Sequence, residues 1–186
     1  MRLRKKQFGL TLHELMVGTA ICSVLVGASA PPFSDFIAKR KVMGASNVIA
    51  AYLEDVKMLS IKRNQFISVT LEKSDDGTHW CIGALPGNGT SCDCLATTPE
   101  CLIDSEPSLI SDTSYADFDV VATAFETGTM TFDPVRGILT TPSQATVIAV
   151  QHKTADYRVR ISVNPTGNVR KCTPAEHALV GYRECT

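Results

Sequence analysis

Hydrophobic and polar positions divide the chain into an uncharged run, an amphipathic stretch and a series of alternating segments. Residues 15–34 contain no charged side chain, and twenty such residues are about the length of a helix that crosses a bilayer. Beyond Pro31 and Pro32, apolar residues recur at steps of three and four, which predicts one buried helical face that ends near Arg63 and Asn64. The residues expected on that face are Val42, Ala45, Ile49, Tyr52 or Leu53, Val56 and Leu59.

After Asn64 the pattern becomes alternating, which is typical of strands. Strands are expected at residues 65–71, 78–83, 128–133, 145–153 and 156–164. The sequence Asp-Asp-Gly at 75–77 makes the first pair a hairpin, and turns are expected at 133–134 and 165–167. Residues 85–117 are expected to form a loop, because proline, glycine and cysteine interrupt them repeatedly. The predicted fold class is therefore α+β, with a long N-terminal helix packed on an antiparallel β-sheet head and a disulfide-bonded loop region.

The N-terminus adds charge to this picture. Residues 1–9 read MRLRKKQFG, and their four cations orient the N-terminus toward the cytoplasm and the rest of the chain away from it. Glu14 is unexpected, because a carboxylate at the start of an apolar run is costly unless it is paired or functional. If the chain were cut after Gly9, the new amine of Leu10 would be a nearby cation for Glu14.

The order of basic leader, Gly9, apolar Leu10 and Glu14 before an apolar helix resembles the class III signal of type IV pilins and of type II secretion pseudopilins. The stretch TFDPVRGILT at 131–140, followed by YRVRISV and PTGNVRKC, resembles the GspH/FimT/FimU group of minor pilins and pseudopilins. The resemblance implies a pilin fold, cleavage after Gly9 by prepilin peptidase, N-methylation of Leu10 and a role of Glu14 in assembly. This chain departs from the family at Leu10, where phenylalanine is usual.

The resemblance also implies a domain organisation and a set of partners. Residues 1–9 would be the leader, 10–34 a transmembrane or filament-core helix, 35–64 its amphipathic half and 65–186 a β-rich head. The partners would be major and minor pilins contacted through the N-terminal helix, prepilin peptidase, and the bacterial inner membrane before assembly, with the head in the periplasm.

The leading interpretation is a minor pilin of a type IV pilus, incorporated into the filament or its tip-priming complex. A type II secretion pseudopilin is the alternative, since both share these features. An ordinary signal peptide cut after residues 28–30 would place Pro31 next to the cut and leave Glu14 unexplained. A simple membrane anchor explains the apolar run but not Gly9 together with Glu14.

Seven cysteines bear on the compartment. Cys22 lies in the apolar run, which leaves six cysteines in the head. An even number of cysteines in an exported domain indicates disulfides. The six are Cys81, Cys92, Cys94, Cys101, Cys172 and Cys185. We expect Cys172 to pair with Cys185. Within residues 81–101 two arrangements are open, either Cys81–Cys92 with Cys94–Cys101 or a crossed one. Zinc is disfavoured because the ligand spacing is uneven.

Charge argues against nucleic acid as the main partner. The formal net charge is −1, and without the four leader cations the balance is 14 basic to 19 acidic side chains. A local basic patch is still expected from Arg158, Arg160, Arg170 and Lys171. In some FimT-type pilins a C-terminal Gly-Arg-x-Arg element supports DNA binding, whereas here Asn168 follows Gly167. A DNA-binding pilin is therefore an alternative that is not favoured.

The sequence carries no catalytic signature. Its four histidines are scattered without metal-ligand spacing, and it has neither a GxSxG motif nor a phosphate-binding glycine loop. The acidic residues at 75–76 could contribute to a calcium site, but such a pair is ordinarily a solvated turn. We therefore expect that the protein is not an enzyme and that it binds neither a cofactor nor a metal ion.

Overall fold

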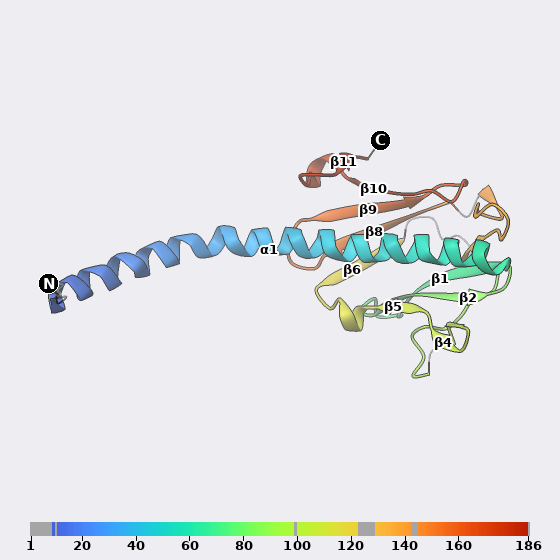
Figure 1. Cartoon of the computed structure of the whole chain (residues 1–186), viewed down its shortest axis with the longest axis horizontal. Helices are drawn as coiled ribbons and strands as arrows, with labels where there is room; N and C mark the ends of the chain where they lie inside the picture. The colour runs from blue at the N-terminus through green and yellow to red at the C-terminus, as the bar shows by residue number, and fades with distance from the viewer. Residues whose placement is uncertain (1–8, 10, 99, 123–128, 143–144, 186) are drawn as a thin grey trace, which may run out of the picture. The chain divides into compact units, whose positions relative to one another are not determined.

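The computed structural model describes residues 9, 11–98, 100–122, 129–142 and 145–185, with the backbone alone at 28–32 and 122. The chain divides into two units, Met1–Ile37 and Ala38–Thr186. A single helix, α1 (Leu12–Arg63), belongs to both units, and all strands belong to the second (Figure 1). Across the described residues, no helix is at once long enough and apolar enough to cross a membrane.

In the first unit, α1 exposes apolar side chains around its whole circumference. The exposed residues there include Leu12, Leu15, Met16, Val17, Ile21, Val24, Leu25 and Val26. A helix that is apolar on all sides is normally covered by other helices or by lipid.

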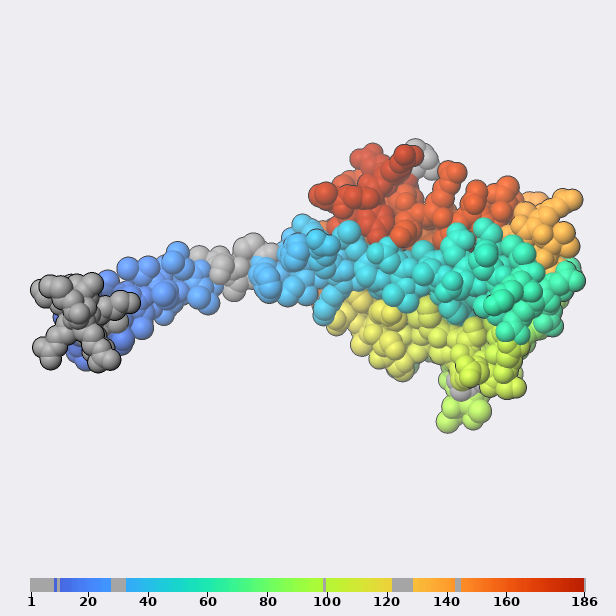
Figure 2. Space-filling view, viewed as in Figure 1, coloured from blue at the N-terminus to red at the C-terminus, as the bar shows by residue number. Residues whose placement is uncertain are grey.

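In the second unit, α1 has one buried face, as its sequence period predicts. Val42, Ala45, Ile49, Leu53 and Val56 are at most 4% exposed, whereas Tyr52 and Leu59 are only partly buried. These side chains form one hydrophobic core with apolar residues of both sheets. In Figure 2, the cyan and green surface of this part of α1 separates the orange and red C-terminal strands from the yellow residues near 110–120.

The end of α1 is defined by Asn64, which has a φ of 50°. The amide of Asn64 donates to the carbonyl oxygen of Ile61 (3.2 Å), and the amide of Gln65 donates to that of Ser60 (3.1 Å). This pair of bonds is the Schellman motif, in which asparagine is one of the few residues that tolerate the left-handed position. The predicted helix end at 63–64 is confirmed.

The first sheet is four-stranded, with the order β5-β2-β1-β7. Its strands are β1 (Ile67–Lys73), β2 (Trp80–Pro86), β5 (Leu109–Ser111) and β7 (Thr129–Phe132). The predicted β1–β2 hairpin is confirmed, with Lys73 opposite Trp80 and Gly77 in its turn at a φ of 70°.

The second sheet is five-stranded, with the order β11-β10-β9-β8-β6. Its strands are β6 (Phe118–Ala122), β8 (Thr146–His152), β9 (Arg158–Val163), β10 (Val169–Thr173) and β11 (Arg183–Glu184). All neighbours are antiparallel except β10 and β11, which are parallel. The indole nitrogen of Trp80 donates to the carbonyl oxygen of Phe118 (3.1 Å) and so joins the two sheets.

The expectation of a structureless loop at residues 85–117 was wrong. The segment contains a small hairpin of β3 (Leu102–Ile103) and β4 (Glu106–Pro107), then β5, and then the 3-10 turn η1 (Asp112–Ser114). These strands are two or three residues long, too short for an alternating pattern to appear in the sequence. A second 3-10 turn, η3 (Ala175–His177), precedes β11.

Two side-chain contacts tie this segment to α1. The hydroxyl of Tyr52 donates to the carbonyl oxygen of Ser108 (2.8 Å), and burial raises the pKa of Tyr52 to about 12. Arg63, the last helical residue, forms an ion pair with Asp104 in the β3–β4 turn. The segment is therefore held against the helix at two points.

Candidate functional site

The start of α1 contains the residues that the sequence predicts to act in processing and assembly. Gly9 is exposed and lies outside the helix, whereas Leu10 and residues 1–8 lie outside the described residues. The Oε2 atom of Glu14 accepts from the amide and the hydroxyl of Thr11 at 3.2 and 3.1 Å, and the Thr11 hydroxyl oxygen accepts from the Glu14 amide at 3.3 Å. This reciprocal pair is a capping box, which satisfies donors that a helix start leaves unpaired.

The capping box gives Glu14 a local structural role beside any role in assembly. Sequence reasoning missed it, although the pattern Thr-x-x-Glu immediately before an apolar run is its usual signal. Glu14 is exposed, so its carboxylate remains accessible to a group from another molecule.

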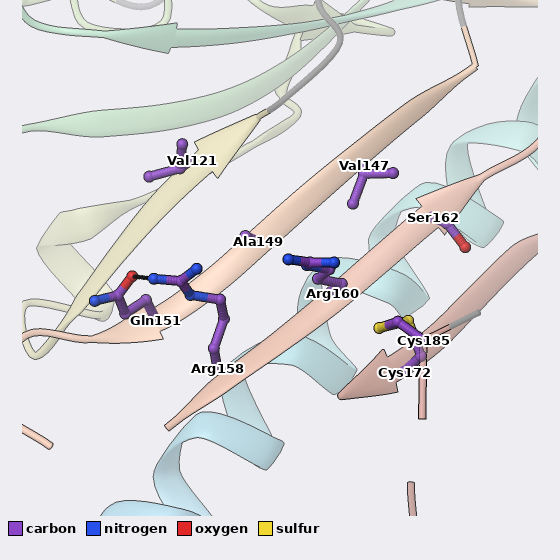
Figure 3. A pocket seen from close by; sticks show the side chains of 9 residues that line it. All are labelled: Val121, Val147, Ala149, Gln151, Arg158, Arg160, Ser162, Cys172 and Cys185. Carbon is purple, nitrogen blue, oxygen red and sulfur yellow. Dashed lines mark hydrogen bonds between the residues drawn. A yellow bond between two sulfur atoms is a disulfide. The ribbon is translucent and has the colours of Figure 1, made fainter. Parts of the chain in front are cut away.

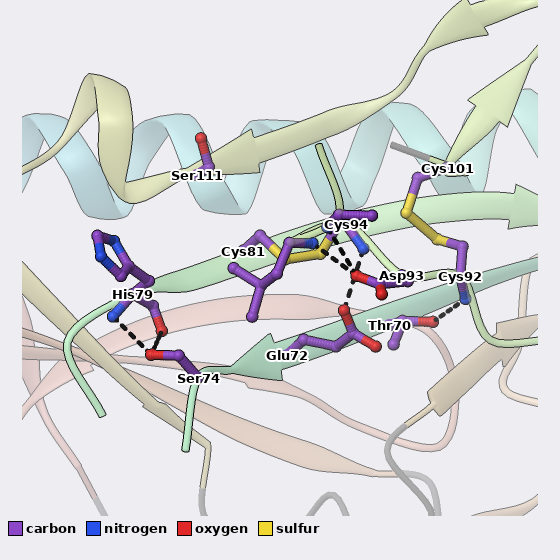
Figure 4. Close-up of a disulfide and its surroundings, with 12 residues drawn as sticks. Thr70, Glu72, Ser74, His79, Cys81, Cys92, Asp93, Cys94, Cys101 and Ser111 are labelled. Carbon is purple, nitrogen blue, oxygen red and sulfur yellow. Dashed lines mark hydrogen bonds between the residues drawn. A yellow bond between two sulfur atoms is a disulfide. The ribbon is translucent and has the colours of Figure 1, made fainter. Parts of the chain in front are cut away.

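The four clustered cysteines form two interleaved disulfides (Figure 4). Cys81 is bonded to Cys94 and Cys92 to Cys101, with Cα–Cα distances of 6.0 and 5.2 Å. This is the crossed arrangement, one of the two that the sequence left open. All four cysteines are at most 5% exposed, so they act as a second small core beneath the segment after β2.

Polar residues of β1 hold the disulfide-bonded segment in place. The Cys92 amide donates to the Thr70 hydroxyl oxygen (3.3 Å), and the Cys94 amide donates to Oε2 of Glu72 (3.0 Å). Burial raises the pKa of Glu72, the bond from the Cys94 amide opposes that rise, and the negative charge of Asp93 adds to it. Glu72 also lies with the sulfur atoms of Cys81 and Cys94 in a group compact enough to hold a metal ion, but those two sulfurs are bonded to each other.

The third disulfide joins Cys172 of β10 to Cys185, just beyond β11, as the sequence led us to expect. Cys22 is the remaining cysteine, and it is exposed on α1.

In the acidic turn at 75–77, the carboxylate of Asp76 is engaged in hydrogen bonds with neighbouring residues of the same turn. The carboxylate of Asp76 accepts from the hydroxyls of Ser74 and Thr78 and from the Thr78 amide, at 2.5, 2.7 and 3.0 Å. These bonds, the one from Ser74 first, lower the pKa of Asp76. The turn is therefore well explained as a structural turn.

The expected basic residues lie mainly on the outer side of the five-stranded sheet. Val159, Ile161 and Val163 of β9 are buried in the core, so the alternate residues Arg158, Arg160 and Ser162 point away from it. Arg170 of β10 is opposite Ser162 in the ladder. We call the surface that carries Arg158, Arg160 and Arg170 the arginine face. Lys171 does not belong to it, because its Nζ donates to Oδ1 of Asn47 on α1 (2.6 Å).

A pocket of about 400 Å³ is sunk into the arginine face (Figure 3). Its walls include Val121, Val147, Ala149, Gln151 and the Cys172–Cys185 disulfide. One guanidinium nitrogen of Arg158, Nη2, donates to Oε1 of Gln151 (2.6 Å), while its buried Nε has no partner among the described residues. Figure 3 shows Arg160 between the Arg158–Gln151 pair and the disulfide.

Comparisons with known proteins bear on the family and the fold of this chain. The family model described as type II transport protein GspH matches residues 45–167. No curated protein matches this chain. Among solved structures, the type IV minor pilin FimU of Pseudomonas aeruginosa strain PAO1 is similar, with 16% identity, a TM-score of 0.50, and coverage of 79% of this chain and 98% of that one. At that identity the likeness concerns the fold alone, and it confirms the pilin fold expected from the sequence.

The family match covers most of the second unit, including all strands of the four-stranded sheet and β6, β8 and β9 of the five-stranded sheet. It lies downstream of Gly9 and Glu14, so it is independent of the N-terminal signature. Pilins and pseudopilins are structural subunits of filaments rather than enzymes. The long capped helix, the disulfide-bonded α+β head and the family match lead to one conclusion, which is that this chain belongs to the GspH family of pilins and pseudopilins.

Proposed function

We propose that the chain is a minor pilin of a type IV pilus, cleaved after Gly9 and incorporated into the filament or its tip-priming complex. The observation that carries this proposal is the capping box of Thr11 and Glu14. It starts α1 only three residues after Gly9, so a chain cut at that glycine would begin with Leu10 and pass almost directly into the helix.

Glu14 is then the residue that joins subunits. The amine of Leu10 would be the cation nearest to it in sequence, and in a filament the same amine on a neighbouring subunit could take that place. An ion pair between two apolar helices specifies how they align, since leaving either charge unpaired there is costly. The apolar side chains exposed all round α1 in the first unit support a place among other helices in the filament and in the inner membrane before assembly.

A pseudopilin of a type II secretion system is the second candidate. The name of the matching family, type II transport protein GspH, favours it. Deleting the gene and measuring both sheared surface pili and the secretion of a type II substrate separates the two. Loss of pili with normal secretion supports the pilus assignment, and the reverse result supports the pseudopilin.

Processing is tested by mass spectrometry of the N-terminal peptide from membrane-extracted protein. We expect a chain that begins with N-methylated Leu10. Gly9→Val should block cleavage and leave residues 1–9 attached. A mature chain that begins at Pro31 would contradict the proposal, because it would identify an ordinary signal peptide.

Assembly is tested with two variants that separate capping from charge. Glu14→Gln keeps an oxygen that can accept from Thr11 but removes the negative charge, whereas Thr11→Ala removes the Thr11 hydroxyl from the capping box and keeps the carboxylate. We expect both variants to be cleaved, and only Glu14→Gln to be depleted from sheared filaments, by about tenfold or more for loss of a contact worth ~1.4 kcal/mol or more. Equal depletion of the two would mean that Glu14 acts only through the helix start.

A further inference from the structure

The arginine face combines unpaired positive charge with exposed apolar surface. We propose that it is a docking site for an acidic segment of another protein, in which a carboxylate side chain with an apolar neighbour enters the pocket over Ala149. The identification of the other protein as a neighbouring pilin rests on the proposed function. The proposal that an acidic segment docks here does not depend on it.

The positive charge of the face is not neutralised by described residues. In the strand ladders, Arg158 is opposite Gln151, and Arg160 lies between Ala149 and Cys172. Asp119 shares the row of Arg158 but is held by Lys73 at 2.8 Å. No ion pair or side-chain hydrogen bond involves Arg160 in the part of the chain that the structure describes.

A second hollow extends the charge along β10 and β11. It adjoins the pocket through the Cys172–Cys185 disulfide, and its charged lining residues are Arg170, Lys171, Arg183 and Glu184. Glu184 is the one acidic side chain that lines either hollow among the described residues. An anionic partner is therefore the complementary one.

The geometry of Arg158 indicates which anion fits. Its Nη2 is engaged by Gln151, while its buried Nε–H has no acceptor among the described residues. A buried donor without an acceptor is unfavourable, and guanidinium groups pair best with planar carboxylate or phosphate oxygens. Docking of such a group in the pocket would bring a counter-charge to Arg158 and Arg160, which both line it.

The apolar part of the pocket favours a peptide over nucleic acid. The outer side of an antiparallel sheet is normally polar, yet here Val121, Val147 and Ala149 lie beside a disulfide. A volume of about 400 Å³ is within the range of small-ligand pockets. A phosphate backbone needs an extended basic surface rather than an apolar hollow. Lys171 lines the second hollow, but its Nζ is engaged by Oδ1 of Asn47 on α1.

The test uses the full chain in a non-ionic detergent and fluorescence anisotropy of labelled peptides. The probe is a blocked peptide with the core Glu-Leu-Glu between Gly-Ser ends, and its twin carries Gln-Leu-Gln. We expect the glutamate peptide to bind at least tenfold more tightly than the glutamine twin. Arg160→Gln should weaken its binding at least fivefold, and Ala149→Leu should abolish binding by filling the pocket. Arg136→Gln, which removes an exposed arginine of the 133–137 turn, is the charge-matched control and should change nothing.

Circular dichroism establishes that each variant is folded. If Arg160→Gln does not fold, Arg160→Lys keeps the charge without the planar fork and should still weaken binding at least twofold. Equal binding of the two peptides, or binding that neither Arg160→Gln nor Ala149→Leu changes, would overturn the proposal. A twelve-nucleotide DNA that binds more tightly than the peptide and depends on Arg160 would also overturn it and assign the face to nucleic acid. The peptide-binding test needs no filament, so a negative result would leave the minor pilin proposal intact. Failure of the chain to enter filaments would likewise leave the docking proposal intact.

Discussion

Gly167 packs directly on the carbonyl oxygen of Gly137, so that a Cβ atom on Gly167 would overlap it. Both glycines have a positive φ, 73° and 63°, and the amide of Leu139 donates to the carbonyl oxygen of Pro165 beside them (3.1 Å). A Cβ atom on Gly137 would in turn press on Ile61 and Lys57 of α1, at 2.9 and 3.1 Å. The two turns and the end of the helix thus form one tightly packed joint.

This close packing predicts that Gly167→Ala destabilises the fold by more than the backbone strain of an alanine at a positive φ. Gly181 is the matched control, because its φ is 95° and nothing lies within 4 Å of where its Cβ would be. We expect Gly181→Ala to cost about 1–3 kcal/mol from backbone strain, and Gly167→Ala to cost clearly more, since the backbone of Gly137 must also move. Thermal unfolding followed by circular dichroism measures both. Equal shifts of the two midpoints would show that the contact with Gly137 is readily relieved.

The interleaved disulfides predict a specific peptide map. Cleavage before Asp93 and after Glu100 separates Cys92, Cys94 and Cys101 onto different fragments. With Cys81–Cys94 and Cys92–Cys101 bonded, all three fragments remain linked as one species until a reductant is added. The sequential pairing would instead release the fragment that ends at Cys92. Mass spectrometry of the non-reduced digest distinguishes the two outcomes.

Glu72 predicts a pH-dependent effect on stability. Its pKa is raised in the folded state above the ordinary value of 4.5, mainly by burial. The contribution of Glu72 to the free energy of unfolding is therefore fully present at a pH below its pKa in the unfolded chain. That contribution is lost as the pH rises through its pKa in the folded chain. Glu72→Gln, which can still accept from the Cys94 amide, should raise the unfolding midpoint by about 1–2 °C at pH 7. That advantage should vanish at pH 4 and below.

The control for this prediction is Glu100→Gln, which removes an exposed carboxylate from the same segment. It should change the midpoint little at either pH. A rise for Glu100→Gln equal to that for Glu72→Gln would mean that net charge, rather than the site of Glu72, is responsible.

DNA binding is predicted to be weak and non-specific at physiological salt. The arginine face contains Arg158, Arg160 and Arg170, but Lys171 is bound to Asn47, and the chain without its leader is acidic overall. Gly167 and Asn168 form a packed turn rather than part of an arginine motif. Anisotropy with a labelled duplex at about 150 mM salt tests this. A micromolar or tighter dissociation constant that is lost in Arg170→Ala would make DNA capture the leading function.

Local sequence determined the elements whose pattern repeats within a few residues. The buried face from Val42 to Val56 follows from the helical period, and the β1–β2 hairpin follows from alternation around an Asp-Asp-Gly turn. The capping box was equally local and was readable as Thr-x-x-Glu. Such features depend only on neighbouring residues, so their physical cause lies within the segment itself.

Tertiary structure decided everything that joins segments distant along the chain. The pairing of Cys81 with Cys94, the separation of the strands into two sheets and the turn of Lys171 toward Asn47 all depend on which surfaces pack together. Sequence placed four basic residues in one patch, but a side chain's direction on β10 is set by its pairing with β9 and by α1 behind it. Periodicity specifies which residues share a face, whereas the partner of that face is chosen by packing through space.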